Sequence, residues 1–311
     1  MLLMTPRPGP RTGFTLVELL VGMILAGAAA TIACRLLVVV ERVTDAESVR
    51  GDLQSTLRNA ALVTRNELRQ LSTGPSDLPV LDADIIAVSD TSISYRALRA
   101  YYVVCAAPES PTAITVDRSA PSDFGAEIRA PAAGDSLFLF VEGDSTQSAD
   151  DRWIRLAISA VSAAPSSCRS PWGAAPRPGY TFTLGAPGIP APVGAAGVFA
   201  GAPVRTFERV TLKSYLSGGQ RWLGMDVDGA GVQPIAGPLA SGGGAAGLEL
   251  RYEDSTGRSL PPTASSIPFV RDVGVVLRGV GQRPVASGGG ARAPVSDSLF
   301  PFVYLRNSSP P

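Results

Sequence analysis

The chain has 311 residues, 45% of them hydrophobic, so it is long enough for one large or two modest domains with an apolar core. Its 27 basic and 27 acidic residues balance, which gives no sign of a nucleic-acid partner. Histidine is absent and Lys213 is the single lysine, which removes the commonest general base, the commonest metal ligand and the usual Schiff-base amine. We therefore expect a protein that is not an enzyme and uses no cofactor.

The first predicted element is a long apolar segment near the N-terminus. A short polar stretch, with Arg7 and Arg11 as its charges, precedes an apolar run over residues 14–34 that only Glu18 interrupts. Apolar residues resume at 36–40. Since about 20 apolar residues span a bilayer as a helix, we predict a transmembrane segment over residues 14–40. The preceding arginines predict a cytoplasmic N-terminus and an extracytoplasmic remainder.

Three kinds of targeting segment compete for this stretch. A secretory signal would be cleaved after the apolar run, near residues 28–30, but it should not carry Glu18 at its centre. A lipoprotein signal would use Cys34, but the chain should then turn polar, and residues 36–40 are apolar. A leader that is cleaved before the apolar run accounts for both features.

The sequence GFTLVE at residues 13–18 resembles the prepilin peptidase site of type IV pilins and type II secretion pseudopilins. In that family, cleavage follows the glycine and the new N-terminal residue is methylated. The resemblance therefore implies a leader of residues 1–13 that ends at Gly13, and N-methylation of Phe14. Glu18 matches the family's glutamate at the fifth mature position.

We expect Glu18 to serve filament assembly. A carboxylate within a spanning helix costs about 2.5–3.5 kcal/mol at the centre of the bilayer and less towards its edge, so it needs a partner. Cleavage creates one in the amine of Phe14, and a neighbouring subunit displaced by about one turn would bring its amine level with Glu18. The alternative is that Glu18 only opposes the positive end of the helix dipole.

The helix is predicted to continue beyond the membrane as an amphipathic half over residues 41–73. Apolar or small residues recur at spacings of mostly three and four, which indicates one buried helix face. These residues are Val43, Ala46, Leu53, Leu57, Ala60, Ala61, Thr64, Leu68 and Leu71. Proline is absent until Pro75, so we expect either a straight helix or a hinge at Gly22 or Gly27.

Residues 75–311 are predicted to form an extracytoplasmic, β-rich head. Short runs of β-forming residues alternate with Gly, Pro, Asp and Ser, and no helical pattern separates them, which favours antiparallel pairing. The predicted strands are 84–88, 100–105, 136–142, 153–161, 205–216, 247–252, 270–278 and 300–305. Residues 228–229 and 254–257 are predicted turns. We expect residues 165–203, rich in Pro and Gly, to form a surface excursion around one short strand, 180–184. The fold class is α+β.

Two features of the head are candidate sites. Cys105 and Cys168 are the two cysteines outside the predicted membrane segment, so we predict a disulfide between them, with Cys34 left as a free thiol. Asp226 and Asp228 open a D-x-D-G pattern that resembles the start of a calcium loop. No closing glutamate follows at the required spacing, which favours a hairpin turn and no metal.

The resemblance implies a minor pilin, a structural subunit at the tip or in the initiation complex of a type IV pilus. The chain is most similar to PilW-type minor pilins, through its size, its N-terminus and the Y-x-D-x-x-G pattern at 252–257, and next to GspJ-type pseudopilins. A type II secretion pseudopilin and a filament-tip adhesin are the alternatives. Implied partners are prepilin peptidase, other minor pilins or pseudopilins and the inner membrane, where the chain crosses once before it enters a filament.

Overall fold

The computed structural model describes residues 13, 15–73, 83–118, 128–143, 151–169, 176–190, 197–241, 247–286 and 292–305. The chain divides into two compact units. The first unit comprises Met1–Leu53 and Gly281–Val295, and the second comprises Gln54–Val280 and Ser296–Pro311. Residues 1–12 of the predicted leader and Phe14, the predicted site of N-methylation, lie outside the described residues.

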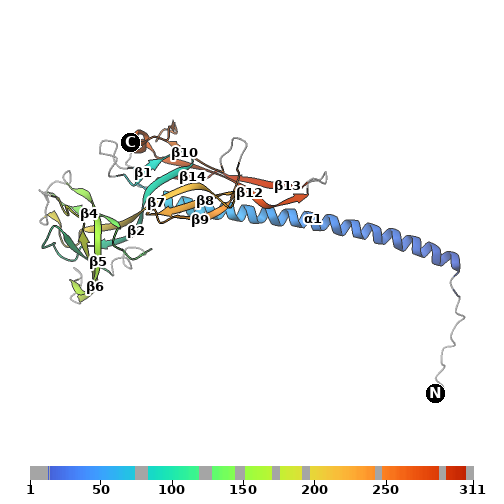
Figure 1. Cartoon of the computed structure of the whole chain (residues 1–311), viewed down its shortest axis with the longest axis horizontal. Helices are drawn as coiled ribbons and strands as arrows, with labels where there is room; N and C mark the ends of the chain where they lie inside the picture. Colours follow the sequence, from blue (N-terminus) through green and yellow to red (C-terminus); the bar gives the residue numbers. More distant parts are fainter. Residues whose placement is uncertain are drawn as a thin grey trace, which may run out of the picture. The chain divides into compact units, whose positions relative to one another are not determined.

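One helix, α1 (Leu16–Leu68), accounts for the N-terminal part of the described chain (Figure 1). At 1.5 Å per residue, its 53 residues extend about 80 Å. The predicted helix is confirmed, and it ends at Leu68, five residues before the predicted limit at residue 73. The helix passes through Gly22 and Gly27 without interruption, so neither glycine acts as a hinge.

The two parts of α1 differ in burial. In the second unit, Leu57, Ala60, Thr64 and Leu68 are buried at the predicted spacings of three and four, which confirms this part of the amphipathic face. In the first unit the predicted face starts later than expected, because Val43 is 51% exposed. The side chains over residues 15–45 are all exposed.

Fourteen strands occur among the described residues, and every pairing with an assigned register is antiparallel. They are β1 (Ile85–Val88), β2 (Ser92–Val103), β3 (Ala113–Asp117), β4 (Ser136–Val141), β5 (Arg152–Arg169), β6 (Pro176–Leu184), β7 (Pro203–Ser217), β8 (Gln220–Val227), β9 (Val232–Leu239), β10 (Leu248–Glu253), β11 (Ser259–Leu260), β12 (Asp272–Ala286), β13 (Arg292–Leu299) and β14 (Phe302–Tyr304). A 3-10 helix, η3 (Ala264–Phe269), precedes β12. The structure thus has an α+β fold, with a long apolar helix and a large antiparallel sheet.

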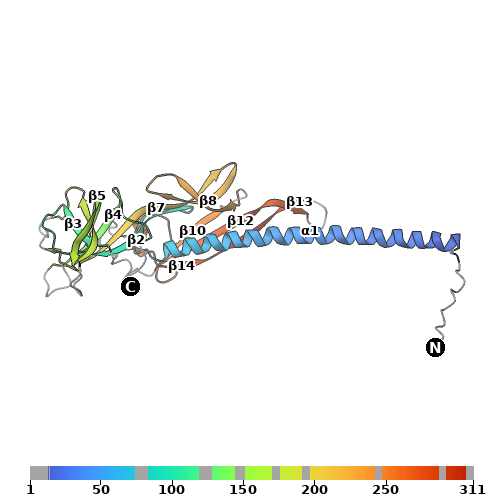
Figure 2. The same ribbon diagram turned by 90° about the horizontal axis from the view of Figure 1, so that it is seen from below.

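Strand β7 organises the sheet of the second unit, because it pairs with β2, β4 and β8. From β7 the order continues in one direction through β4, β5, β6 and β3, which Figure 2 shows close together, and in the other through β8, β9, β12 and β10. The 18-residue β5 pairs with β4 over its first part and with β6 over the rest. A buried apolar cluster on β2 to β7 includes Tyr102, Leu137, Leu139, Ile158 and Phe182.

The segment 165–203 differs from the predicted surface excursion. Strand β5 continues to Arg169, and β6 occupies Pro176–Leu184, four residues longer than the predicted strand. The side chains of Phe182 and Val198 are fully buried. Pairing of β6 with both β5 and β3 satisfies its backbone, which allows a Pro- and Gly-rich stretch to lie within the sheet.

Candidate functional site

The start of α1 is built around a reciprocal pair of hydrogen bonds between Thr15 and Glu18. The Glu18 backbone N–H donates to the Thr15 hydroxyl (3.2 Å), and the Thr15 backbone N–H donates to Oε2 of Glu18 (3.0 Å). The Thr15 hydroxyl also donates to Oε2 (3.1 Å). This is a capping box, in which N-cap and N3 side chains satisfy each other's backbone donors. It fixes the helix start two residues after Gly13, the residue before the predicted cleavage point.

The capping box constrains what Glu18 can do. Both donors from Thr15 go to Oε2, and in the part of the chain that the structure describes no partner is assigned to Oε1. A cation can therefore approach Oε1 of Glu18 without breaking the hydrogen bonds of the cap. The T-x-x-E spacing of residues 15–18 is the sequence signal for this cap, which neither the assembly role nor the helix-dipole role of Glu18 includes.

The helix that follows is the one candidate membrane span among the described residues. Its most apolar 18-residue window is not buried at all against the rest of the protein. Leu16, Met23 and Leu37 expose more than two thirds of their surface, and Cys34 is a free, exposed thiol on the same stretch. An exposed apolar helix of this length is explained by a lipid environment or by partner helices.

The two cysteines that the sequence pairs lie in a disulfide bond. Cys105 and Cys168 have Cα atoms 4.9 Å apart and are separated by 63 residues in the chain. The bridge joins the segment after β2 to the end of β5, and the Cys105 N–H donates to the Thr115 carbonyl (2.8 Å). A β-carbon at Gly179 would lie 2.7 Å from Sγ of Cys168, so this position accommodates only glycine beside the bridge.

Asp226 and Asp228, the calcium candidates, lie at the hairpin between β8 and β9. The Lys213 ammonium donates to Oδ2 of Asp226 (3.1 Å), and the Gly231 N–H donates to Oδ1 (3.2 Å). These two donors lower the pKa of Asp226. Asp228 adopts a left-handed conformation (φ 51°) and accepts the Arg209 N–H (2.9 Å). The carboxylates thus stabilise the predicted turn, and no group of three or more metal-ligating side chains occurs among the described residues.

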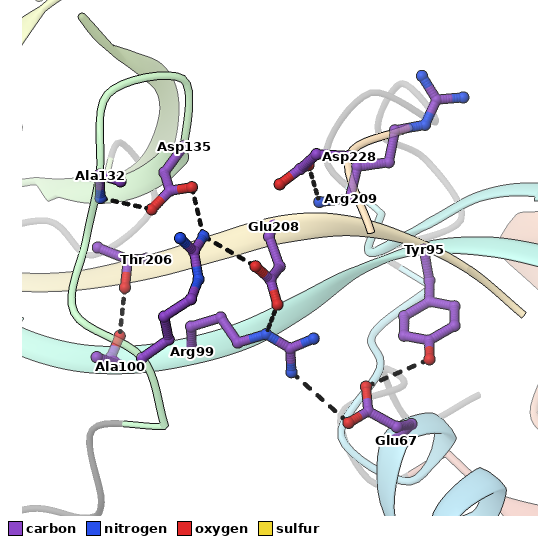
Figure 3. Close-up of polar contacts among 11 residues, drawn as sticks. Glu67, Tyr95, Arg99, Ala100, Ala132, Asp135, Thr206, Glu208, Arg209 and Asp228 are labelled. Carbon is purple, nitrogen blue, oxygen red and sulfur yellow. Dashed lines mark hydrogen bonds and ion pairs between the residues drawn. The ribbon is translucent and has the colours of Figure 1, made fainter. Parts of the chain in front are cut away.

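A chain of buried and partly buried charges, which sequence reasoning missed, joins the end of α1 to the sheet in the second unit (Figure 3). Arg99 on β2 donates through Nε to Glu208 on β7 and lies 3.6 Å from a Glu67 oxygen on α1. Arg129 contacts both Glu208 (2.8 Å) and Asp135 (2.6 Å). Arg99, Asp135 and Glu208 are each less than 9% exposed. The chain of contacts holds the helix end and two strands in one arrangement.

Tyr95 extends this chain of charges, because its hydroxyl donates to Oε2 of Glu67 (3.2 Å). Burial and the Glu67 carboxylate raise the pKa of Tyr95 well above its usual range, so it stays a neutral donor. The partners come from residues 67, 95, 99, 129, 135 and 208, and no local pattern links such distant positions.

A cleft of about 560 Å³ lies between the end of α1 and strands β2, β4 and β7 of the second unit. Its lining includes Asp84, Arg96, Tyr101 and Arg205. Burial raises the pKa of Asp84 to about 6, although its carboxylate accepts the Ser72 N–H (2.7 Å). The Arg205 guanidinium lies 4.3 Å from the centre of the Trp153 ring and 5.4 Å from that of Tyr101.

The tryptophans form packing contacts. Trp153 packs edge-on against Phe140 (5.5 Å between ring centres), and the Trp222 ring covers Gly237, where a β-carbon would lie 2.6 Å from it. These contacts give Trp153 and Trp222 a role in packing.

Comparisons with protein-family models, curated proteins and solved structures found no match for this chain.

Proposed function

We propose that this chain is a minor subunit of a type IV pilus. The observation that carries the proposal is the arrangement at the N-terminus. A glycine at position 13 precedes a capped helix whose first turn contains Glu18. The side chains that follow are exposed as far as Val40, and Arg35 is the one charged residue among them. In a soluble globular protein, such a helix would expose a large apolar surface to water. In a filament subunit, lipid covers this surface before assembly and neighbouring helices cover it in the filament core.

Glu18 and the amine created by cleavage supply the specific contact. Oε2 of Glu18 accepts hydrogen bonds from Thr15, and Oε1, which has no partner among the described residues, can accept a neighbour's positive amine. In a low-dielectric helix bundle, an ion pair of this kind is stronger than it is in water, and a misplaced subunit leaves both charges unpaired. The contact would therefore set the axial step between subunits.

The second unit supports a structural role over a catalytic one. Its buried charges pair with one another, its disulfide closes a long loop, and Asp226 is held by Lys213. Each arrangement stabilises a rigid body for display outside the membrane. The large head favours a minor component at the tip or in the initiation complex. A type II secretion pseudopilin would use the same N-terminal chemistry.

A filament-tip adhesin is the second candidate, and a row of exposed aromatic rings favours it. Phe302 and Tyr304 on β14 and Phe300 just before it recur at every second position with exposures of 60%, 64% and 55%, and Phe269 is 52% exposed. Aromatic rings exposed together are typical of a binding surface. If this candidate is correct, Phe302→Ser with Tyr304→Ser abolishes attachment to surfaces and leaves incorporation into filaments unchanged.

The pilus proposal is tested in filaments sheared from cells of the native host. We expect the chain in purified filaments at a small fraction of the main subunit, and its loss from the sheared fraction when the main subunit is deleted. A pseudopilin would instead copurify with secretion components. A chain that stays in the membrane fraction of piliated, secreting cells and enters neither assembly contradicts the proposal.

A further inference from the structure

A cleft of about 400 Å³ lies in the first unit, just beyond the predicted membrane span. Helix α1 contributes Arg42, Asp45 and Val49 to its lining. Arg283 on β12 and Arg292 on β13 line it from the other side, and these two strands pair with each other. The cleft is therefore bounded by a helix and a hairpin that belong to the same compact unit.

The charges around this cleft do not balance. Three guanidinium groups face one carboxylate, that of Asp45, which leaves an excess of two positive charges. Among the residues that the structure describes, Arg42, Arg283 and Arg292 form no ion pair and no side-chain hydrogen bond. Glu41 and Glu47, the neighbouring carboxylates on the helix, are exposed and do not line the cleft. The cleft thus has the charge to bind an anion.

The hairpin is held close to the helix by a glycine. A β-carbon at Gly281 would lie 2.8 Å from Cγ1 of Val49, closer than real β-carbons come. Val49 itself is buried. Glycine at this position lets the strand approach α1, and the approach brings Arg283 and Arg292 to the side of the cleft opposite Arg42.

The position of the cleft along α1 indicates which anion it meets. From Leu16 to Arg42 the helix rises about 39 Å at 1.5 Å per residue. The hydrocarbon core of a bilayer is about 30 Å thick, and the polar headgroups extend the total to about 40–45 Å. With Leu16 at one edge of the hydrocarbon, Arg42 lies at the outer side of the opposite headgroup layer. Arginine side chains are long enough to reach back to the phosphates.

We propose that Arg42, Arg283 and Arg292 bind the phosphate of a phospholipid headgroup in the leaflet from which the head emerges. Guanidinium groups suit phosphate because their N–H donors match two of its oxygens at once. The inference rests on the proposed function only in that α1 must span the membrane. The contact holds the hairpin on the membrane surface, and it has to break when the subunit leaves the bilayer for a filament.

The test uses the full chain in a nonionic detergent. Dihexanoyl phosphatidylglycerol is titrated in, and the bound fraction is read by native mass spectrometry. Each arginine near an anionic headgroup contributes about a factor of five in affinity. Arg283→Gln with Arg292→Gln should therefore weaken binding about 30-fold. The matched control, Arg209→Gln with Arg258→Gln, removes the same charge from exposed arginines of the second unit and should leave binding unchanged.

A variant with the opposite effect guards against misfolding of the hairpin. Asp45→Asn removes the one carboxylate of the cleft and should tighten phosphatidylglycerol binding severalfold. Equal binding by the wild type and the double arginine variant overturns the inference, as does weaker binding by Asp45→Asn. Inorganic phosphate that competes at the same concentration as the lipid also overturns it, since the site would then recognise a free anion rather than a headgroup.

The outcome is separable from that of the pilus proposal, because neither prepilin peptidase nor filaments are present in the titration. A chain that binds the lipid but never enters filaments retains the headgroup site and loses the proposed function. A chain that enters filaments without selective lipid binding loses the headgroup site alone.

Discussion

At the scale of single residues, Glu18 carries two possible roles that one substitution separates. The capping box of α1 needs an acceptor at this position, and glutamine can provide it as well as glutamate. Pairing with a neighbouring subunit's amine needs the negative charge. The sequence TLVE at residues 15–18 is compatible with both roles, and the structure shows only the first, the helix cap.

We predict that Glu18→Gln keeps the helix cap but loses most of its incorporation into filaments. We predict the same loss of incorporation for Glu18→Ala, which also removes the cap. Both variants should insert into the membrane and form the disulfide of the head. Incorporation is measured by the ratio of this chain to the main subunit in purified filaments. Wild-type incorporation of Glu18→Gln, with a deficit confined to Glu18→Ala, would mean that Glu18 is a cap and nothing more.

Asp84 provides a prediction for pH dependence. Burial raises the pKa of Asp84 from its ordinary value of 3.8 to about 6, so the folded state favours the protonated carboxyl. The stability from this group is present below pH 3.8 and is lost as the pH rises through about 6. Between pH 4 and pH 7 the wild type should lose about 2 kcal/mol of unfolding free energy relative to Asp84→Asn.

Urea unfolding of both proteins at the two pH values measures this difference, with tryptophan fluorescence as the signal. Asp84→Asn is the appropriate comparison because its side-chain oxygen still accepts the Ser72 N–H. A constant difference between the two proteins from pH 4 to pH 7 would show that Asp84 titrates at its ordinary pKa.

At the scale of elements, the buried charges fix how the end of α1 meets β2 and β7. Glu208 accepts from both Arg99 and Arg129, so Glu208→Ala leaves two guanidinium groups without their shared partner. Removal of one member of a buried ion pair costs about 3–5 kcal/mol. The matched control is Glu249→Ala, which removes a pair of exposed or partly exposed bridges worth about 0–1 kcal/mol. Equal losses of unfolding free energy in the two variants would contradict this account.

The disulfide stabilises the second unit by closing a loop of 63 residues. Loop-closure entropy predicts that Cys105→Ala with Cys168→Ala loses about 4 kcal/mol of unfolding free energy. Cys34→Ala is the control, because this free cysteine lies on the exposed part of α1 and should leave the stability of the second unit unchanged. Oxidised wild type and the double variant with the same urea midpoint would contradict the prediction.

The elements divide into those that a sequence pattern specifies and those that depend on the rest of the fold. The spacing of Leu57, Thr64 and Leu68 predicts the buried helix face because the 3.6-residue period is a local property. Strand β9 was not predicted, because it contains Pro234, Gly237 and Pro238, which are rare in strands. Hydrogen-bonded pairing with β8 holds these residues in an extended conformation.

The same distinction applies to the candidate sites. The turn at Asp228 and the helix start at Thr15 follow from residue types a few positions apart. Two sites bring together side chains that are more than 100 residues apart: the cluster around Glu208 and the arginine cleft around Arg283. No local spacing in the sequence predicts either site.

At the scale of the whole molecule, the described residues combine an exposed apolar helix with a β-rich antiparallel sheet. The apolar part of α1 is suited to a membrane or to partner helices, and the charged cleft beyond it suits a headgroup layer. Under the proposed function, the bilayer meets both needs before assembly. In the proposed filament, packed helices would replace the lipid around α1, and the cleft would have to release its headgroup.

The central claim, that residues 1–13 are a prepilin leader, is tested most directly by the N-terminal mass of the chain purified from its native host. We predict a chain that begins at Phe14 and bears an N-methyl group, and an unprocessed chain when Gly13 is replaced by leucine. Gly27→Leu, a matched change within the helix, should leave processing intact. A mature terminus at Cys34 or near residues 28–30, or a leader retained in the presence of prepilin peptidase, would contradict the account.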